Sequence, residues 1–203
     1  MKLKHPCSGV ILSGGLNTRM GGQNKAFLSV GNQQILDRLY GTLAGVFKEL
    51  LLVSNAPLEY LSWDLTIVTD LFQIRSSLTG IHAGLFHAST SHVFVTACDM
   101  PFLKEGLIRM LLDVFEPGWD VIIPVTEKGY QPLCAIYSRR CIKPIEHQLG
   151  NQDPKIVNFF SKVRVKKVDE EQIKKVDPEL VSFFNINRPE ELATSDRMLD
   201  VLK

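Results

Sequence analysis

The sequence predicts a single-domain α/β fold in which a mostly parallel sheet carries helices on both faces. Three observations predict it. Short apolar runs alternate with segments of helical period, which is the pattern of strands joined by crossover helices. A glycine-rich segment follows the first apolar run directly. The chain has 203 residues, 45% of them hydrophobic, which suffices for one substantial core. Together these features indicate a Rossmann-like architecture.

Five short apolar runs have the length and composition of strands. They cover residues 9–12, 50–53, 65–68, 93–97 and 121–124. The run 93–97 is almost continuously apolar, which is typical of a strand covered on both faces. These runs therefore predict the central part of a parallel sheet.

Two segments between these runs repeat their apolar residues with a period near 3.6, as amphipathic helices do. The first contains Ile35, Leu36, Leu39, Leu43, Val46 and Phe47, and the second Leu107, Ile108, Leu111, Leu112 and Phe115. Each segment lies between two predicted strands, so each is expected to cover one face of the sheet.

The second half of the chain is less regular. Residues 132–138 and 163–168 read as strands, and residues 144–149 as a short helix. The charge-rich run 162–175 is expected to form a solvated edge strand and a turn. Residues 189–202 begin with a proline and two glutamates, which favour a helix N-terminus.

Charge and composition exclude several classes of protein. The formal charge of +1, from 23 basic and 22 acidic residues, is not that of a nucleic-acid binder. No apolar run approaches the roughly 20 residues that cross a bilayer, and the first residues lack a secretory signal's apolar core. Cys7, Cys98, Cys134 and Cys141 form no Cys-x-x-Cys pair. We therefore expect a cytoplasmic protein with reduced thiols and no membrane contact.

The glycine-rich segment, residues 12–22, reads L-S-G-G-L-N-T-R-M-G-G and is followed by Lys25. Glycines let backbone amides approach phosphate oxygens, and Arg19 and Lys25 add donors and positive charge. The segment is not a Walker A loop, because Lys25 is followed by Ala26, and the dinucleotide fingerprint is also missing. An ordinary strand-to-helix turn is the alternative. Two cations without phosphate partners would be costly there, so we favour triphosphate binding.

Two aspartates follow predicted strands: Asp70 comes after residues 65–68, and Asp99 after residues 93–97. Ligands of open α/β sheets bind outside the carboxyl ends of the strands, so both carboxylates are expected to face one crevice with the glycine-rich segment. A carboxylate placed there suits Mg²⁺. The alternatives are a helix N-cap for Asp99 and a turn aspartate for Asp70.

The pattern L-[AS]-G-G-x-x-x-R-M-G-x-x-x-K, from Leu12 to Lys25, resembles the start of the nucleotidyltransferase superfamily. The Gly14-Gly15 pair is more like the molybdenum cofactor guanylyltransferases, since cytidylyltransferase relatives usually carry Ala-Gly there. The resemblance therefore implies guanine as the base. Two departures stand out: Asn24 replaces a frequent aspartate, and residues 76–77 are Ser-Ser where the family often has Gly-Pro.

The resemblance also implies roles for individual residues. Those implied for catalysis are Arg19, Lys25 and Asp99. Those implied for nucleotide binding are Leu12, Ser13, Gly14, Gly15, Lys25, Asn55, Asp70 and Asp99. Asp99, in a Cys-Asp-x-Pro segment, is the implied ligand of the cofactor Mg²⁺.

Residues 185–192, N-I-N-R-P-E-E-L, resemble a family segment that lies near the metal and the acceptor. Two-residue spacing on a strand would put Asn185 and Asn187 on one face. Capping of the next helix is the alternative for Asn187. Basic candidates for binding the acceptor's phosphate are Arg75, Arg139, Arg140 and Lys155.

The implied reaction transfers GMP from GTP to the terminal phosphate of molybdenum-molybdopterin and releases pyrophosphate. Residues 1–125 would form the nucleotide-binding half and residues 126–203 the acceptor-binding half. The small-molecule partners would be GTP and molybdopterin, with molybdoenzyme apo-proteins or their chaperones as candidate protein partners. The alternatives are a molybdopterin cytidylyltransferase, a sugar-phosphate nucleotidyltransferase and a non-catalytic carrier protein.

Overall fold

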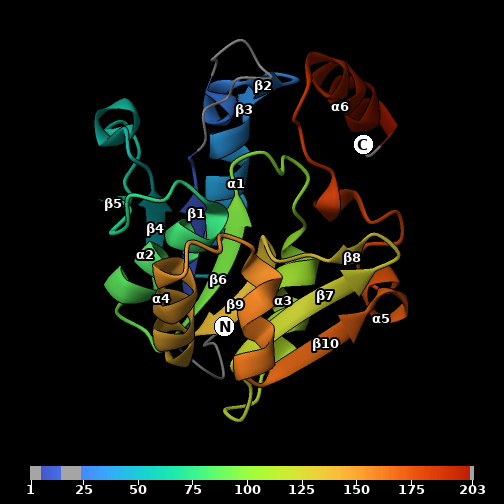
Figure 1. The fold of residues 1–203 in the computed structure, drawn as a ribbon. Coiled ribbons are helices and arrows are strands. Elements are labelled where there is room, and N and C mark those ends of the chain that lie inside the picture. The colour runs from blue at the N-terminus through green and yellow to red at the C-terminus, as the bar shows by residue number, and fades with distance from the viewer. Residues whose placement is uncertain (1–5, 15–23, 202–203) are drawn as a thin grey trace.

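The computed structural model describes residues 6–14 and 24–201 and confirms the predicted α/β fold (Figure 1). Its main sheet has the strand order β10-β7-β9-β6-β1-β4-β5, with β8 paired to β7. The strands are β1 Ser8–Leu12, β4 Leu50–Val53, β5 Thr66–Val68, β6 His92–Ala97, β7 Val121–Thr126, β8 Gly129–Tyr130, β9 Cys134–Ser138 and β10 Val165–Asp169. Strands from both halves of the chain thus belong to one sheet.

Most neighbouring long strands are parallel, as predicted. β1 pairs in parallel with β4 and β6, β4 with β5, and β10 with β7. β9 is the exception, because it lies antiparallel between β6 and β7. The carboxyl ends of β1, β4, β5 and β6 therefore meet at one edge of the sheet.

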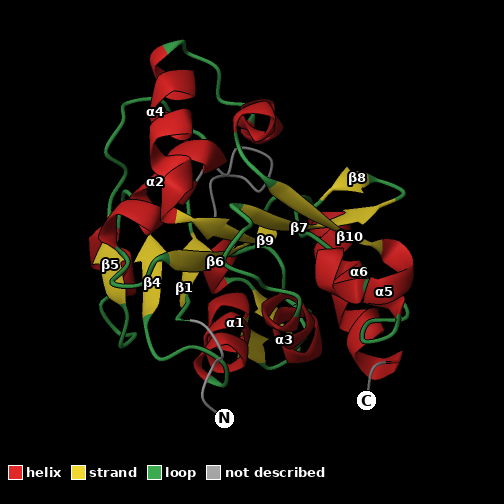
Figure 2. Ribbon diagram, turned by 90° about the horizontal axis from the view of Figure 1, so that it is seen from below, coloured by secondary structure: helices red, strands yellow, loops and turns green. Residues whose placement is uncertain are grey.

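Helices cover both faces of the sheet (Figure 2). Helices α1 (Ile35–Ala44) and α3 (Glu105–Asp113) pack on one face, and α2 (Ser77–His87) and α4 (Ile142–Gly150) on the other. Successive residues of a strand point to opposite faces of the sheet and so belong to different cores. Ile11 lies in the core beneath α1 and α3, and Val10 in the core beneath α2 and α4. The remaining helices and strands are η2 Lys25–Phe27, β2 Ser29–Val30, β3 Gln33–Gln34, η3 Pro57–Tyr60, η4 Arg139–Cys141, η5 Ile156–Lys162, α5 Glu170–Lys174, η6 Val181–Phe183 and α6 Pro189–Val201.

Helix α2 has no counterpart among the predicted elements. Residues 78–85 are all buried, so this stretch lacks the apolar and polar faces that reveal an amphipathic helix. Its glycines bring it close to β1: a Cβ added at Gly84 would lie 2.8 Å from Val10 Cγ1, and one at Gly80 3.1 Å from Leu12 Cδ2. Ser76 caps its N-terminus, because Ser76 Oγ accepts a hydrogen bond from the Thr79 amide.

Two predicted segments differ in detail. The helical pattern of residues 35–47 ends at Ala44, yet Val46 and Phe47 stay buried in the turn that follows. In the charge-rich run, β10 is an edge strand as predicted, but the predicted turn is wrong because helix α5 follows. Asp169 caps α5 by accepting a hydrogen bond from the Gln172 amide, which favours a helix over a turn.

All four cysteines are free and buried, in agreement with the expected reduced thiols. Burial raises the pKa of Cys7 to about 12. Burial, together with the neighbouring Asp99 carboxylate, raises the pKa of Cys98 to about 11. Within the part of the chain that the structure describes, no helix is both long and apolar enough to cross a membrane.

Candidate active site

The strand order of the sheet reverses at β1. From β1 the chain adds β4 and β5 on one side and then returns to add β6 on the other. Such a switch point, at the carboxyl ends of the strands, is where open α/β sheets bind ligands. The Cys98 amide donates to the Leu12 carbonyl at 3.0 Å and so holds the ends of β6 and β1 together. The predicted site residues around Leu12 and Asp99 therefore lie at the switch point.

Lys25, Asp99 and Asn187 converge at this place from three distant segments. Lys25 Nζ lies 3.0 Å from Asp99 Oδ2 and donates to Asn187 Oδ1 at 2.7 Å. The side chains of Lys25 and Asp99 are only 14% and 19% exposed. Asn24 caps the short helix η2, since Asn24 Oδ1 accepts from the Ala26 amide. The cap fixes the backbone that carries Lys25.

The helix-cap interpretation of Asp99 is wrong. The N-cap of α3 is Lys104, and the Asp99 carboxylate binds Lys25 instead. The backbone of Asp99 also contributes to the site, because its carbonyl accepts a hydrogen bond from the Ile186 amide at 2.9 Å. The C-terminal segment that carries Asn187 is thus attached directly to the loop that follows β6.

The two predicted asparagines have different surroundings, and the strand expected for them is wrong because residues 184–187 pair with no strand. Ile186 between them is fully buried, whereas Asn185 is exposed. The capping interpretation of Asn187 is also wrong, since its carbonyl oxygen accepts from Lys25. The Glu191 carboxylate accepts from the backbone amides of Asn187 and Arg188, just before α6.

Asn55 and Asp70 form a second pair at the same edge of the sheet. Asn55 Nδ2 donates to Asp70 Oδ2 at 2.8 Å, and Asn55 Oδ1 accepts from the Asp70 amide at 3.2 Å. Burial raises the pKa of Asp70 above 3.8, although the hydrogen bond from Asn55 and the charge of Arg75 oppose the shift. Asn55 follows β4 and Asp70 follows β5, so β1 lies between this pair and the end of β6, where Asp99 is found. The site therefore has two anchor points, one on each side of β1.

Tyr60 and Glu59 belong to the surroundings of the site but carry no motif that sequence inspection would find. The Tyr60 hydroxyl lies 2.7 Å from Ser13 Oγ and accepts from Asn24 Nδ2 at 2.6 Å. Asn24 Nδ2 also donates to Glu59 Oε2 at 2.8 Å. An aspartate could not donate to Glu59, so these contacts account for the asparagine that departs from the family pattern.

Only some of the remaining predicted residues of the glycine-rich segment are among the residues that the structure describes. Leu12 and Ser13 are buried, and Gly14 is exposed. A Cβ added at Gly14 would meet no described atom within 4 Å. Gly15 and Arg19 lie outside the described residues.

Two of the basic candidates for the acceptor's phosphate lie at the wrong edge of the sheet. The Arg139 amide donates to the carbonyl of Ser91, just before β6, and Arg140 Nε lies 2.5 Å from Asp120 Oδ1, just before β7. Both arginines therefore lie at the amino end of β6 and β7, opposite Asp99. The prediction rested on their positive charge, and charge alone does not reveal at which edge of the sheet a residue lies.

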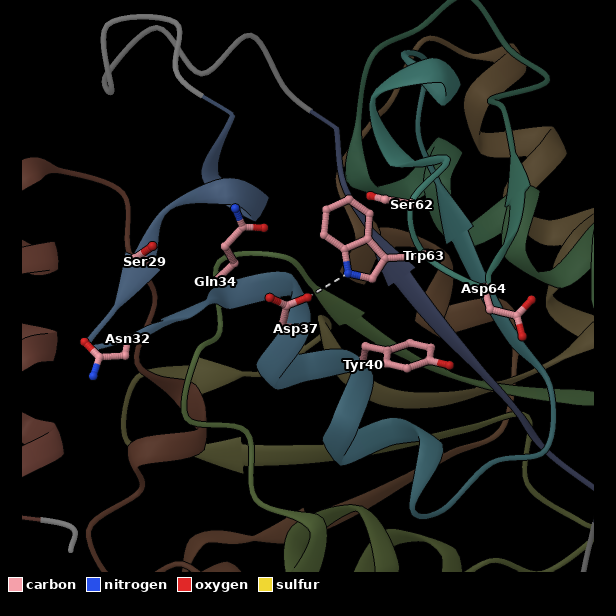
Figure 3. A pocket seen from close by; sticks show the side chains of 8 residues that line it. All are labelled: Ser29, Asn32, Gln34, Asp37, Tyr40, Ser62, Trp63 and Asp64. Atoms are coloured by element: carbon pink, nitrogen blue, oxygen red, sulfur yellow. Dashed lines mark hydrogen bonds between the residues drawn. The ribbon is translucent and has the colours of Figure 1, made fainter.

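A polar pocket of about 670 Å³ lies beside α1 (Figure 3). It is lined by Ser29, Asn32, Gln34, Asp37, Tyr40, Ser62, Trp63 and Asp64. The Trp63 indole donates to Asp37 Oδ1 at 2.8 Å, as Figure 3 shows. None of the predicted site residues lines this pocket.

The chemistry of the site suits a hard divalent cation. Asp99 Oδ2 and Asn187 Oδ1 already converge on one cationic centre, the ammonium of Lys25. Mg²⁺ prefers such oxygen ligands and takes only one or two protein carboxylates, the rest being water and phosphate. The described residues contain no cluster of three histidine, cysteine or acidic side chains that could hold a metal ion. A magnesium site of this kind does not require such a cluster.

The fold and the convergence of Lys25 and Asp99 at the switch point are those of a nucleotidyltransferase. Residues 9–165 match the MobA-like NTP transferase domain. The chain belongs to this family. It is 43% identical over 189 residues to the molybdenum cofactor guanylyltransferase of Desulfosudis oleivorans, covering 93% of this chain and 94% of the relative.

Two further comparisons agree. The probable molybdenum cofactor guanylyltransferase of Pelotomaculum thermopropionicum is 38% identical, covering 95% of this chain and 93% of its own. The crystal structure of molybdopterin-guanine dinucleotide biosynthesis protein A from Archaeoglobus fulgidus superimposes with a TM-score of 0.85 at 26% identity, covering 96% of this chain and 99% of that one. The similarity thus extends over nearly the whole chain.

Proposed function

We propose that this enzyme transfers GMP from GTP to the terminal phosphate of molybdenum-molybdopterin, giving the guanine dinucleotide form of the cofactor. The observation that carries the proposal is the convergence of Lys25, Asp99 and Asn187 at the switch point of the sheet. The names of the relatives supply the base and the acceptor.

In the proposed step, an oxygen of the acceptor's terminal phosphate attacks the α-phosphorus of GTP. A new P–O bond forms, the bond from the α-phosphorus to the β-phosphate's bridging oxygen breaks, and pyrophosphate leaves with that electron pair. The acceptor phosphate is already ionised near neutral pH, so no general base is required. Positioning and neutralisation of charge are therefore the main tasks of the protein.

The residues of the site divide these tasks. Lys25, with Arg19 as expected from the sequence, stabilises negative charge on the phosphates of GTP. Asp99 and Asn187 would hold Mg²⁺, which when bound neutralises charge on the phosphate oxygens. On the other side of β1, the Asn55–Asp70 pair would hold the nucleoside portion. The product is a cofactor, so molybdoenzyme apo-proteins or their chaperones are the proposed recipients.

The test is to incubate the purified protein with molybdopterin, Mg²⁺ and each of the four nucleoside triphosphates, and to measure pyrophosphate release and the dinucleotide product. GTP is expected to give the product. A product formed faster from CTP would replace the proposal by cytidylyl transfer, and GTP binding without turnover would indicate a carrier. Omission of molybdopterin is the control, because hydrolysis of GTP between its α- and β-phosphates would still release pyrophosphate but would form no dinucleotide.

A further inference from the structure

One buried hydroxyl contacts both the start of the glycine-rich segment and the residue that precedes Lys25. Ser13 precedes residues 14–23 and Asn24 follows them, and the Tyr60 hydroxyl lies 2.7 Å from Ser13 Oγ and 2.6 Å from Asn24 Nδ2. Tyr60 is 1% exposed, so solvent does not compete for these bonds. Ser13 is 47 residues and Asn24 is 36 residues from Tyr60 in sequence, so only the fold brings them together.

The ring of Tyr60 is itself held in place. Its centroid lies 5.2 Å from that of Phe27 and 6.2 Å from that of Trp63, and Phe27 and Trp63 stack at 5.7 Å. Trp63 is fixed in turn by its hydrogen bond to Asp37 on α1. The hydroxyl is therefore presented from a packed aromatic cluster rather than from a mobile side chain.

The hydrogen bonds of this network are mutually compatible. Asn24 uses one amide hydrogen for Tyr60 and the other for Glu59, and its carbonyl oxygen accepts from the Ala26 amide at 3.1 Å. With Asn24 as donor, the Tyr60 proton is free to be donated to Ser13. The three bonds of Asn24 orient the first turn of η2, which begins at Lys25.

We propose that Tyr60 is a positioning residue for nucleotide binding: its hydroxyl holds Ser13 and Asn24 together, and through Asn24 it fixes where Lys25 meets the triphosphate. This role rests on the proposed function for the identity of the nucleotide. It assigns no contact between Tyr60 and the substrate.

The first test compares Tyr60→Phe with the wild type. The variant keeps the ring and its packing and removes both hydrogen bonds. Tyr137→Phe is the matched control, because Tyr137 is also fully buried and its hydroxyl donates to the Pro132 carbonyl at 2.7 Å. We expect Tyr60→Phe to weaken binding of Mg²⁺-GTP about tenfold by calorimetric titration, the factor that corresponds to one hydrogen bond of ordinary strength. Tyr137→Phe is expected to bind Mg²⁺-GTP as the wild type does.

The outcomes separate the positioning role from the proposed function. Wild-type affinity in Tyr60→Phe, or equal loss in both variants, would overturn the positioning role. If the wild type binds Mg²⁺-GTP and transfers no GMP to molybdopterin, the proposed function fails while a loss confined to Tyr60→Phe still supports the positioning role. If the wild type binds no nucleoside triphosphate at all, both ideas fail.

A second test uses the departure from the family pattern. Asn24→Asp introduces the residue frequent in relatives, but here it places a carboxylate beside Glu59. We expect Mg²⁺-GTP binding to weaken roughly two- to fivefold, the scale of interactions between exposed charges. The loss should shrink in about 1 M salt. The double variant Asn24→Asp with Glu59→Gln should recover affinity, whereas failure of this rescue would remove Glu59 from the network.

Discussion

Lys25 Nζ lies 3.0 Å from Asp99 Oδ2, although 74 residues separate them in sequence. The pair joins η2, which follows the glycine-rich segment, to the loop after β6. Both partners are mostly buried, so the ion pair is only partly screened by solvent. A phosphate that binds at the switch point would therefore meet a cation that is already oriented.

Replacement of this cation gives the first prediction. Lys25→Ala should weaken GTP binding by about 1 to 3 kcal/mol, the usual contribution of hydrogen bonds to charged groups. Titration with Mg²⁺-GTP measures it. Lys174→Ala is the control, because the side chain of Lys174 is 49% exposed and forms an ion pair with Glu170 on α5. Unchanged affinity and turnover in Lys25→Ala would remove Lys25 from the site.

Asp99→Asn tests the proposed metal ligand, since it keeps the size of the side chain and deletes its charge. We expect a folded protein of near-normal thermal stability that loses at least about two orders of magnitude in rate, where each tenfold loss corresponds to roughly 1.4 kcal/mol of barrier. Added Mg²⁺ should restore the rate only in part. The measurement is guanylyl transfer against Mg²⁺ concentration, and near wild-type turnover would contradict the metal assignment.

Gly14→Ala tests base selectivity. GTP is expected to be preferred over CTP, ATP and UTP by the wild type, from the Gly14-Gly15 pair. Because an added Cβ would meet no described atom within 4 Å, the variant should fold normally. We expect the GTP-to-CTP ratio of kcat/KM to fall by about tenfold, the scale of one methyl group in a pocket. An unchanged ratio would show that residues other than Gly14 determine base selectivity.

Two helical glycines should respond in opposite directions to alanine. Gly84→Ala puts a Cβ 2.8 Å from Val10 Cγ1 and should destabilise the fold by about 1–3 kcal/mol, as overpacking does. Gly41 lies in α1 with nothing within 4 Å of its added Cβ, so Gly41→Ala should stabilise by about 0.5–1 kcal/mol. Urea unfolding of both variants provides the comparison. A stable Gly84→Ala protein would show that α2 can move away from β1.

The sequence predicts those helices and strands in which apolar residues recur with a regular spacing or form a continuous run. The strands around β1 and β6 and the helices α1 and α3 were predicted because each shows a continuous or amphipathic apolar pattern. Helix α2 was missed because residues 78–85 are buried all round. Within the site, Lys25 and Asp99 follow recognisable motifs, and the structure brings them together.

Tertiary contacts explain what the sequence could not predict. Tyr60 contacts Ser13, just after β1, and Glu59 contacts Asn24 through tertiary structure alone, since tyrosine in a short helix has no motif of its own. Arg140 was placed in the site by charge, yet its ion pair with Asp120 keeps it at the opposite edge. Whether a residue lies in the candidate site thus depends more on which end of a strand it is next to than on its charge.

The stacking of Phe27 on Trp63 has a spectroscopic consequence. The chain has two tryptophans, and the other, Trp119, lies under Lys166 just before β7. Phe27 is two residues from Lys25, so a shift of η2 changes the surroundings of the Trp63 indole. In a Trp119→Phe protein, Trp63 would be the sole indole fluorophore, and its emission would follow nucleotide binding in real time without an attached label.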